Sequence, residues 1–169
     1  SIFLHPESMI NFHFASDLCD YLLKYKYGEM GMSNIGVESL LSTNLDHVKK
    51  ELIESRNMGE LFVKMAEDLI PKYFEKNFIY QISNITKKGC VITASPNSDV
   101  MDQLNSRLVG NHATALVKQG IAAAWPRIIG LPAANVRQIA CIYRGDPAIK
   151  YDVNYEQSAH LLGRKRSMN

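Results

Sequence analysis

The chain has 169 residues, of which 46% are hydrophobic and 21% are charged, and its net charge is +2. These values are typical of one globular domain and exclude a strongly basic nucleic-acid-binding surface. The three cysteines, Cys19, Cys90 and Cys141, are odd in number and far apart, so they do not indicate a disulfide framework. No apolar run approaches the ~20 residues of a membrane-spanning helix, and we expect a cytoplasmic protein.

The first half of the chain is predicted to be helical. Residues 1–8 are expected to form an arm, and apolar residues recur at helical spacing from 9 to about 27. Gly28, Gly31 and the stretch 33–36 break that pattern. A second helix is predicted after residue 44 and a third from 59 to about 74. The residues predicted to point inward from these helices are Phe12, Ala15, Leu18, Cys19, Leu22, Leu23, Leu45, Val48, Leu52, Ile53, Leu61, Phe62, Met65, Ala66, Leu69 and Ile70.

The period of the pattern changes in the second half of the chain. Residues 78–82 and 90–94 are β-branched and aromatic runs with a polar turn between them, which predicts a hairpin. A long helix is predicted to begin near Asp99 and to continue toward Trp125. Pro126 should end or kink it, because proline cannot donate a helical hydrogen bond.

A second hairpin is predicted from residues 135–143 and 149–155. The order of elements predicts an α+β fold, with an antiparallel sheet made of two hairpins (β-β-α-β-β). The N-terminal helices and one long central helix are expected to pack on that sheet. Residues 1–155 are predicted to form one domain, and the polar residues 156–169 a linker.

The sequence contains no recognisable catalytic signature. Phosphate-binding glycine loops, dinucleotide fingerprints, zinc-protease motifs and serine-hydrolase elbows are all missing from it. No two histidines lie three or four residues apart, as paired metal ligands on a helix often do. We therefore expect no enzymatic activity. The five dispersed histidines are His5, His13, His47, His112 and His160.

His112 is the polar residue with the strongest case for a functional role. It lies four residues after Leu108 and four before Leu116, so the helical repeat predicts that it points toward the core. The interpretation we favour is a buried imidazole bonded to a backbone carbonyl. A second is a polar group that orients a ligand inside an apolar cavity. Axial haem ligation is a third, which nothing else in the sequence favours.

Aromatic residues form the other notable set. Such rings are most often ordinary core residues, because they bury the largest apolar areas. If a cavity lies between the sheet and the long helix, these rings are expected to line it together with His112. The candidate ligand-binding residues are therefore His112, Trp125, Tyr80, Phe78, Leu108, Leu116 and Tyr73.

From about Gly36 onward the chain resembles a group of bacterial sensory domains. The matching features are the long helix that ends at residues 130–132, the strand that ends in Cys141, and the pattern Cys141-x-x-x-Gly145-x-Pro147. These features are similar to the vinyl-4-reductase-type domain of aromatic-responsive transcription activators, and more distantly to haem nitric-oxide-binding folds. Domains of this group precede output modules in one-component regulators, histidine kinases and nucleotide cyclases.

The chain departs from the vinyl-4-reductase type at its zinc site. In that type, an acidic residue and two cysteines surround a structural zinc. Here Cys141 matches the first cysteine, but Ile149 stands at the second and Gln138 at the acidic position. A structural zinc needs about four ligands, so we expect no zinc, and Cys141 is predicted to be a small buried residue. Gly145 can still form the turn by adopting a positive φ.

The resemblance implies a cytoplasmic input domain of a bacterial signalling protein or transcription regulator. It would bind a small apolar or aromatic molecule between sheet and helices and relay binding to a downstream output domain. We expect a homodimer. We expect the domain to bind no cofactor and to contact neither nucleic acid nor a membrane. The main alternative is a protein-interaction or dimerisation module without a small-molecule ligand, which loss of the zinc pattern favours. A small enzyme is a third interpretation, for which the sequence offers no nucleophile–base pair.

Overall fold

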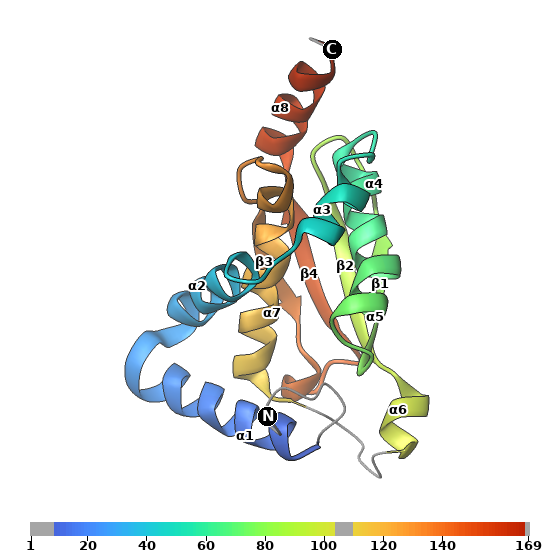
Figure 1. Ribbon diagram of the computed structural model, residues 1–169. Coiled ribbons are helices and arrows are strands. Elements are labelled where there is room, and N and C mark those ends of the chain that lie inside the picture. Colours follow the sequence, from blue (N-terminus) through green and yellow to red (C-terminus); the bar gives the residue numbers. More distant parts are fainter. Residues whose placement is uncertain (1–8, 104–109, 168–169) are drawn as a thin grey trace.

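The computed structural model describes residues 9–103 and 110–167 (Figure 1). A four-stranded antiparallel sheet, in the order β1-β2-β4-β3, carries the helices on one face. The predicted α+β fold with two hairpins is therefore confirmed. The strands are β1 (Phe78–Ser83), β2 (Gly89–Pro96), β3 (Asn135–Ala140) and β4 (Ile149–Asn154). The helices are α1 (Met9–Leu22), α2 (Gly28–Leu41), α3 (Asp46–Leu52), α4 (Met58–Val63), α5 (Ile70–Tyr73), α6 (Ser98–Gln103), α7 (His112–Ala124) and α8 (Glu156–Ser167).

The sheet has one buried face because its apolar residues alternate along each strand. In β4 this alternation is perfect, with Ile149, Tyr151 and Val153 buried and the residues between them exposed. The pairing keeps these residues in line with inward residues of β2, since Tyr151 lies opposite Ile92. The core therefore lies between this face and the helical layer.

The N-terminal helices differ in part from the prediction. The chain stays helical from Met9 to Leu41, passing through a π-helical turn (Leu23–Tyr27) and changing direction at Gly28, whose φ is +60°. Gly31 and residues 33–36, which were expected to break the pattern, lie within α2. Ala15 and Leu18 of α1 were predicted to point inward but are exposed, because α1 packs mainly against α2 and α7 rather than on the sheet.

The second and third predicted helices are present. In α3, Val48 and Leu52 are buried as expected, but Ile53 is 60% exposed because the helix ends before it. The third spans Met58–Tyr73, in which α4 and α5 are joined by a π-helical turn (Lys64–Leu69). Its predicted stripe is confirmed, and the buried residues are Leu61, Phe62, Met65, Ala66, Leu69 and Ile70.

The central helix α7 begins later than predicted. Asn111 caps it: its side chain accepts a hydrogen bond from the Thr114 backbone N–H, and the Thr114 hydroxyl accepts one from the Asn111 N–H. This reciprocal cap satisfies orphan donors of the first turn, so the helix starts at His112 rather than near Asp99. Its predicted end is confirmed by a 3₁₀ turn (Trp125–Ile129) that stops at the left-handed Gly130.

Helices α2 and α7 cross in close contact through two glycines. A Cβ atom at Gly36 would stand 2.0 Å from the carbonyl oxygen of Val117, and one at Gly120 would stand 1.7 Å from that of Ser33. Both distances are far below contact, so only glycine permits this approach of the two backbones. Gly36 of α2 is therefore a packing residue rather than a helix breaker, as Gly120 is in α7.

The turn after β3 closes without a metal ligand set. Gly145 has a φ of +97°, as expected, and the Asp146 carboxylate accepts a 2.7 Å hydrogen bond from the Cys141 backbone N–H. Cys141 itself is buried, as expected. Among the residues that the structure describes, no group of three or more His, Cys, Asp or Glu side chains is placed to hold a metal ion.

The C-terminal residues form a helix where a polar linker was expected. Helix α8 is attached by Ser158, whose hydroxyl donates a 2.7 Å hydrogen bond to the Pro132 carbonyl, and by the buried Leu162. Its connection to a further module stays a prediction. Within residues 9–103 and 110–167, no helix is long and apolar enough to cross a lipid bilayer.

Candidate functional site

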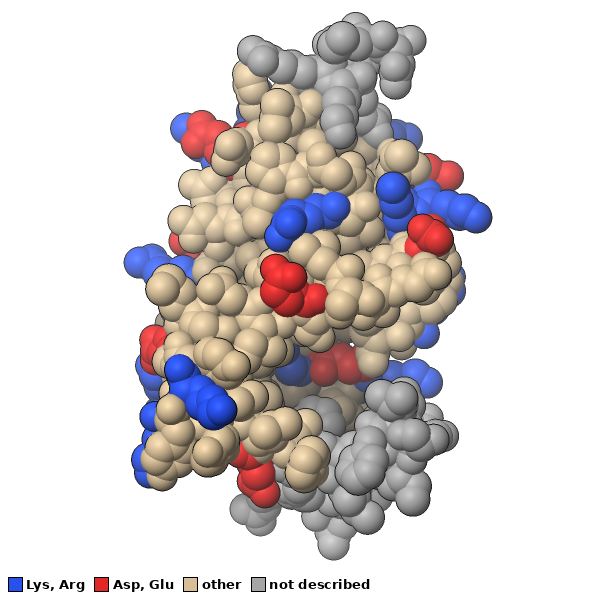
Figure 2. All heavy atoms as spheres, turned by 60° about the vertical axis from the view of Figure 1, so that its left-hand side comes forward, with Lys and Arg blue, Asp and Glu red and all other residues tan. Residues whose placement is uncertain are grey.

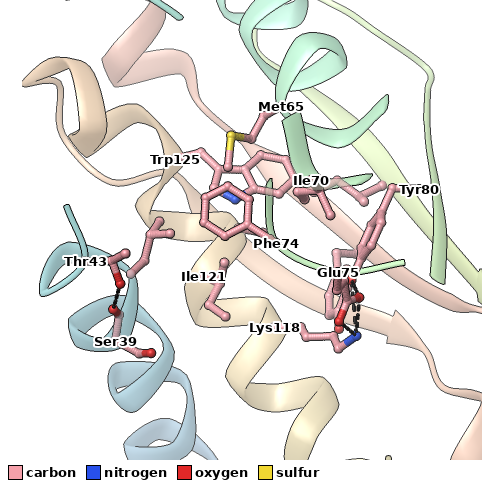
Figure 3. Close-up of a pocket in the computed structure, with 14 residues that line it drawn as sticks. Ser39, Thr43, Met65, Ile70, Phe74, Glu75, Tyr80, Lys118, Ile121 and Trp125 are labelled. Carbon is pink, nitrogen blue, oxygen red and sulfur yellow. Dashed lines mark hydrogen bonds and ion pairs between the residues drawn. The ribbon is translucent and has the colours of Figure 1, made fainter. Parts of the chain in front are cut away.

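A cavity of about 260 Å³ lies between the helical layer and the buried face of the sheet (Figure 3). The wall is formed by α2 and α7, by the segment from Met65 to Glu75, and by strands β1, β2 and β4. Most of the lining is apolar. The lining residues are Ser39, Leu40, Thr43, Met65, Ile70, Phe74, Glu75, Tyr80, Ile92, Lys118, Ile121, Ala122, Trp125 and Tyr151.

Local structure explains why these side chains converge. On the sheet, Tyr80, Ile92 and Tyr151 lie on neighbouring strands and all belong to the buried face. Trp125, which directly follows α7, lies seven residues after Lys118, and this spacing brings both to the same face of the helix. The cavity is therefore the part of the sheet–helix interface that the side chains do not fill.

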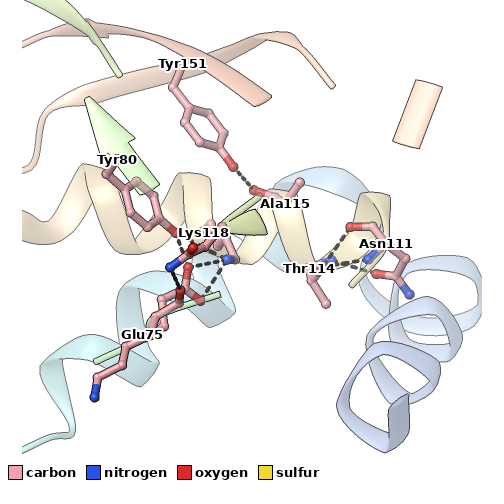
Figure 4. Close-up of polar contacts among 9 residues, drawn as sticks. Glu75, Tyr80, Asn111, Thr114, Ala115, Lys118 and Tyr151 are labelled. Atoms are coloured by element: carbon pink, nitrogen blue, oxygen red, sulfur yellow. Dashed lines mark hydrogen bonds and ion pairs between the residues drawn. The ribbon is translucent and has the colours of Figure 1, made fainter. Parts of the chain in front are cut away.

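Three polar side chains meet at one end of the cavity (Figure 4). Lys118 Nζ lies 2.6 and 2.8 Å from the two carboxylate oxygens of Glu75 and 3.2 Å from the Tyr80 hydroxyl. The Tyr80 hydroxyl also donates to Glu75. The Lys118 ammonium stands 3.9 Å from the centre of the Phe78 ring, a favourable cation–π distance. With side chains only 14% and 22% exposed, Lys118 and Glu75 form a largely buried ion pair.

Trp125 supplies a polar group at another part of the wall. Its side chain is only 1% exposed, and among the described residues no acceptor pairs with its indole Nε1–H. A buried donor without a partner costs free energy that a suitable acceptor would recover. Trp125 therefore carries a buried donor that no described acceptor pairs with, in a side chain that lines the cavity.

The tyrosines of the cavity wall remain neutral at ordinary pH. Burial, together with the negative charge of Glu75, raises the pKa of Tyr80 and of Tyr151 well above their usual value of 10. The Tyr151 hydroxyl donates a 2.8 Å hydrogen bond to the Ala115 carbonyl of α7 (Figure 4). That bond joins the sheet to the central helix.

These pKa shifts predict a loss of stability in alkali. A tyrosine whose pKa is raised by folding loses its proton more readily in the unfolded chain, so its contribution is complete below pH 10 and falls as the pH rises beyond it. Urea unfolding across this range is expected to show a declining free energy of unfolding. In Tyr151→Phe the free energy of unfolding should fall less steeply with pH, because one of the two tyrosines that lose a proton on unfolding is missing. An unchanged slope in that variant would contradict the assignment.

The structure brings together two of the seven sequence-predicted ligand residues, Tyr80 and Trp125, in the cavity wall. Phe78 is buried beside them but is not part of the wall, because its ring lies against Lys118. Tyr73 is 40% exposed and its hydroxyl donates to the Glu51 carboxylate, so it lies outside the cavity. The proposed ligand-binding role of these residues stays a prediction.

Two of the remaining three predicted residues lie at a different site. His112 and Leu116 border a second, polar hollow of about 430 Å³. The expected carbonyl partner of His112 is not observed; its Nε2 accepts from Arg144 at 2.7 Å, and its Nδ1 lies 3.7 Å from Cys141 Sγ. His112 stands in the first turn of α7 and is half-buried. Leu108 lies outside the described residues.

Sequence reasoning missed the charged pair of the cavity. Lys118 follows Ala115 by three residues and precedes Ala122 by four, and both alanines are buried. This spacing places Lys118 on the inward face of α7, so a lysine inside an apolar stripe was a usable signal. Glu75 carried no comparable signal, because it follows α5 in an irregular segment.

Comparison with known proteins shows the fold. The chain matches no protein-family profile, and no curated protein matches it. One similar structure is trafficking protein particle complex subunit 3 from Naegleria fowleri, covalently bound to palmitic acid, with a TM-score of 0.57, 11% identity, and coverage of 87% of this chain and 96% of that one. Another is the phenol-responsive sensory domain of the transcription activator PoxR with phenol, with a TM-score of 0.57, 14% identity, and coverage of 99% and 82%. The chain thus shares its fold with a sensory domain and with a trafficking subunit.

Proposed function

We propose that this chain is a ligand-sensing input domain that binds a small, mostly apolar molecule in the cavity between sheet and helices. The observation that carries the proposal is the cavity itself, with its apolar wall and few polar groups. Concave apolar sites with a small number of placed polar groups are typical of small-molecule binding. The domain acts as a regulator rather than as an enzyme, in the cytoplasm of a bacterial cell.

The size of the cavity supports a compact ligand. An apolar cavity of about 150 Å³ is enough to hold benzene, so about 260 Å³ accommodates one aromatic ring with a short substituent. The unpaired Trp125 N–H favours a ligand with an acceptor atom, such as the oxygen of a hydroxyl or carbonyl group. Phenol, which accompanies the PoxR sensory domain in its crystal structure, has this size and chemistry.

The cavity wall also supports a mechanism of relay. Helices α2 and α7 both line the cavity and cross at Gly36 and Gly120, where neither can shift without the other. A ligand that contacts both helices favours one of their arrangements and shifts the population toward it. The change then passes to an output domain through α8, and a homodimer of this domain is part of the proposal.

Thermal denaturation with phenol, benzyl alcohol, benzoate and hexanoate tests the proposal. Binding to the native state at about 100 times the Kd adds about 2.7 kcal/mol, which corresponds to a rise of roughly 5–10 °C in Tm for a domain of this size. Ala122→Leu fills the cavity from α7 and should abolish the rise. Ser39→Phe, at an exposed position of the wall, should block the cavity without altering the core.

A matched control separates cavity filling from a general effect of leucine on a helix. Ala15 is exposed on α1, so the variant Ala15→Leu should show the full rise in Tm when a ligand is added. The proposal fails if none of the four compounds stabilises the protein, or if Ala122→Leu and Ser39→Phe respond as the wild type does.

A protein-interaction module is the second candidate function, and one surface favours it. Large apolar side chains are exposed to solvent on the face formed by α1 and α2. Figure 2 shows only scattered charged residues on that face. Exposed apolar clusters of this kind often mark protein contacts. The likeness to a subunit of a trafficking complex agrees with this alternative. The exposed residues are Phe14, Leu18, Tyr21, Tyr25, Tyr27 and Met30.

A further inference from the structure

The hydrogen bonds of Lys118 bear on which ligands the cavity accepts. A lysine ammonium has three N–H groups and no acceptor. Three oxygen atoms lie within reach of Lys118 Nζ: the two of Glu75, at 2.6 and 2.8 Å, and the Tyr80 hydroxyl, at 3.2 Å. The Phe78 ring covers the ammonium at 3.9 Å. Lys118 therefore has no N–H left to offer the carboxylate of a ligand.

The charges of the cavity wall also cancel. Among the described residues that line it, Glu75 and Lys118 are the only ionic side chains, and their charges neutralise each other. Tyr80 and Tyr151, the other titratable groups that face the cavity, stay neutral because burial raises their pKa values. A charged ligand would have to leave water for this wall without gaining an opposite charge, which is costly.

The same cluster has one open acceptor. Among the residues that the structure describes, Glu75 Oε1 accepts from both Tyr80 and Lys118, whereas Oε2 accepts from Lys118 alone. A carboxylate oxygen can accept about two hydrogen bonds, so Oε2 has room for a further donor. A ligand hydroxyl or N–H group fits this position, because it would pair with Glu75 without disturbing the ion pair.

We propose that the Glu75–Lys118 pair makes this cavity selective for uncharged ligands with a hydroxyl or N–H donor, and that it excludes carboxylates of the same size. The inference rests on the proposed function, that the cavity holds a small molecule. It adds the chemical class of that molecule and assigns the selection to Glu75 and Lys118. Neither residue was recognised from the sequence.

Calorimetric titration of the full chain with benzyl alcohol and with benzoate, at neutral pH, tests the inference. These probes share a ring and differ mainly in charge. Wild-type protein is expected to bind benzyl alcohol at least about tenfold more tightly than benzoate, because the anion must be desolvated without a free partner. Glu75→Gln leaves Lys118 without its counter-ion. The ratio should then shift at least about tenfold toward benzoate, since the free ammonium can pair with its carboxylate.

Two further variants serve as controls. Glu51→Gln removes a carboxylate from the exposed Glu51–Lys72 pair outside the cavity and should leave the ratio unchanged. The double variant Lys118→Met/Glu75→Gln has no ammonium left to pair with a carboxylate, so it should not show the shift toward benzoate that is expected of Glu75→Gln. The ratio measured for the wild type keeps the test decisive if Glu75→Gln folds poorly. Tighter binding of benzoate than of benzyl alcohol by the wild type overturns the inference alone. The inference is also overturned if folded Glu75→Gln has the same ratio of affinities for benzyl alcohol and benzoate as the wild type. Failure of both probes and of phenol to bind overturns the proposed function itself.

Discussion

Replacing Lys118 with methionine is expected to lower the free energy of unfolding by about 2–4 kcal/mol, since removing one partner leaves the other charge buried and unpaired. The carboxylate of Glu75 would lose two close contacts to Lys118 while keeping the one from Tyr80. Methionine retains most of the apolar stem of lysine, so packing changes little. Urea unfolding followed by circular dichroism measures the difference.

The double variant Lys118→Met/Glu75→Gln should recover most of that loss. Removal of both charges eliminates the desolvation cost, and a buried ion pair is often no more stabilising than its neutral replacement. Lys72→Met provides the matched comparison: its pair with Glu51 is at the surface, where solvent screens the charges, so its loss should cost far less than the loss of the cavity pair. Equal losses for Lys118→Met and Lys72→Met would mean that the cavity pair is solvated rather than buried.

Substitution of Gly120 by alanine is expected to destabilise the protein by about 3 kcal/mol or more, because the added methyl group meets backbone and not a flexible side chain. The new Cβ would stand 1.7 Å from the Ser33 carbonyl oxygen and 2.6 Å from its carbon. Helices α2 and α7 would have to separate, which opens the core on which the cavity depends. Thermal and urea unfolding provide the measurement.

Gly163→Ala is the control for this prediction. Gly163 lies in α8 with no other atom within 4 Å of the added Cβ. Alanine in a helix interior is roughly 0.5–1 kcal/mol more favourable than glycine, so this variant should be neutral or slightly stabilised. A Gly120→Ala protein as stable as Gly163→Ala would refute the close crossing of α2 and α7.

Local patterns determined the class of the fold. Runs of β-branched and aromatic residues at 78–82 and 90–94, with a polar turn between them, predicted a hairpin, and both runs lie in the observed sheet. The stripe from Leu61 to Ile70 identified a helix that packs on that sheet. These predictions succeed because backbone geometry fixes the periods of strands and helices within a few residues.

The limits of α2 and α7 were not accessible to the same reasoning. Glycines usually indicate a turn, yet Gly36 and Gly120 lie inside helices, where each makes room for the backbone of the other helix. The reciprocal cap of Asn111 and Thr114 ended the long predicted helix at a position that the apolar repeat did not mark. Both outcomes depend on contacts between segments far apart in the chain.

The sequence by itself determined the α+β class, the two hairpins, and two aromatic residues that line the cavity, Tyr80 and Trp125. Only the tertiary structure decided where the cavity lies and which charges face it. Glu75 and Lys118 are separated by 42 intervening residues and carry no joint pattern, so their pairing appears only when α7 packs on the sheet. The physical reason is that periodicity encodes which face of an element is apolar, whereas a binding site depends on how several such faces fit together and on the space they leave unfilled.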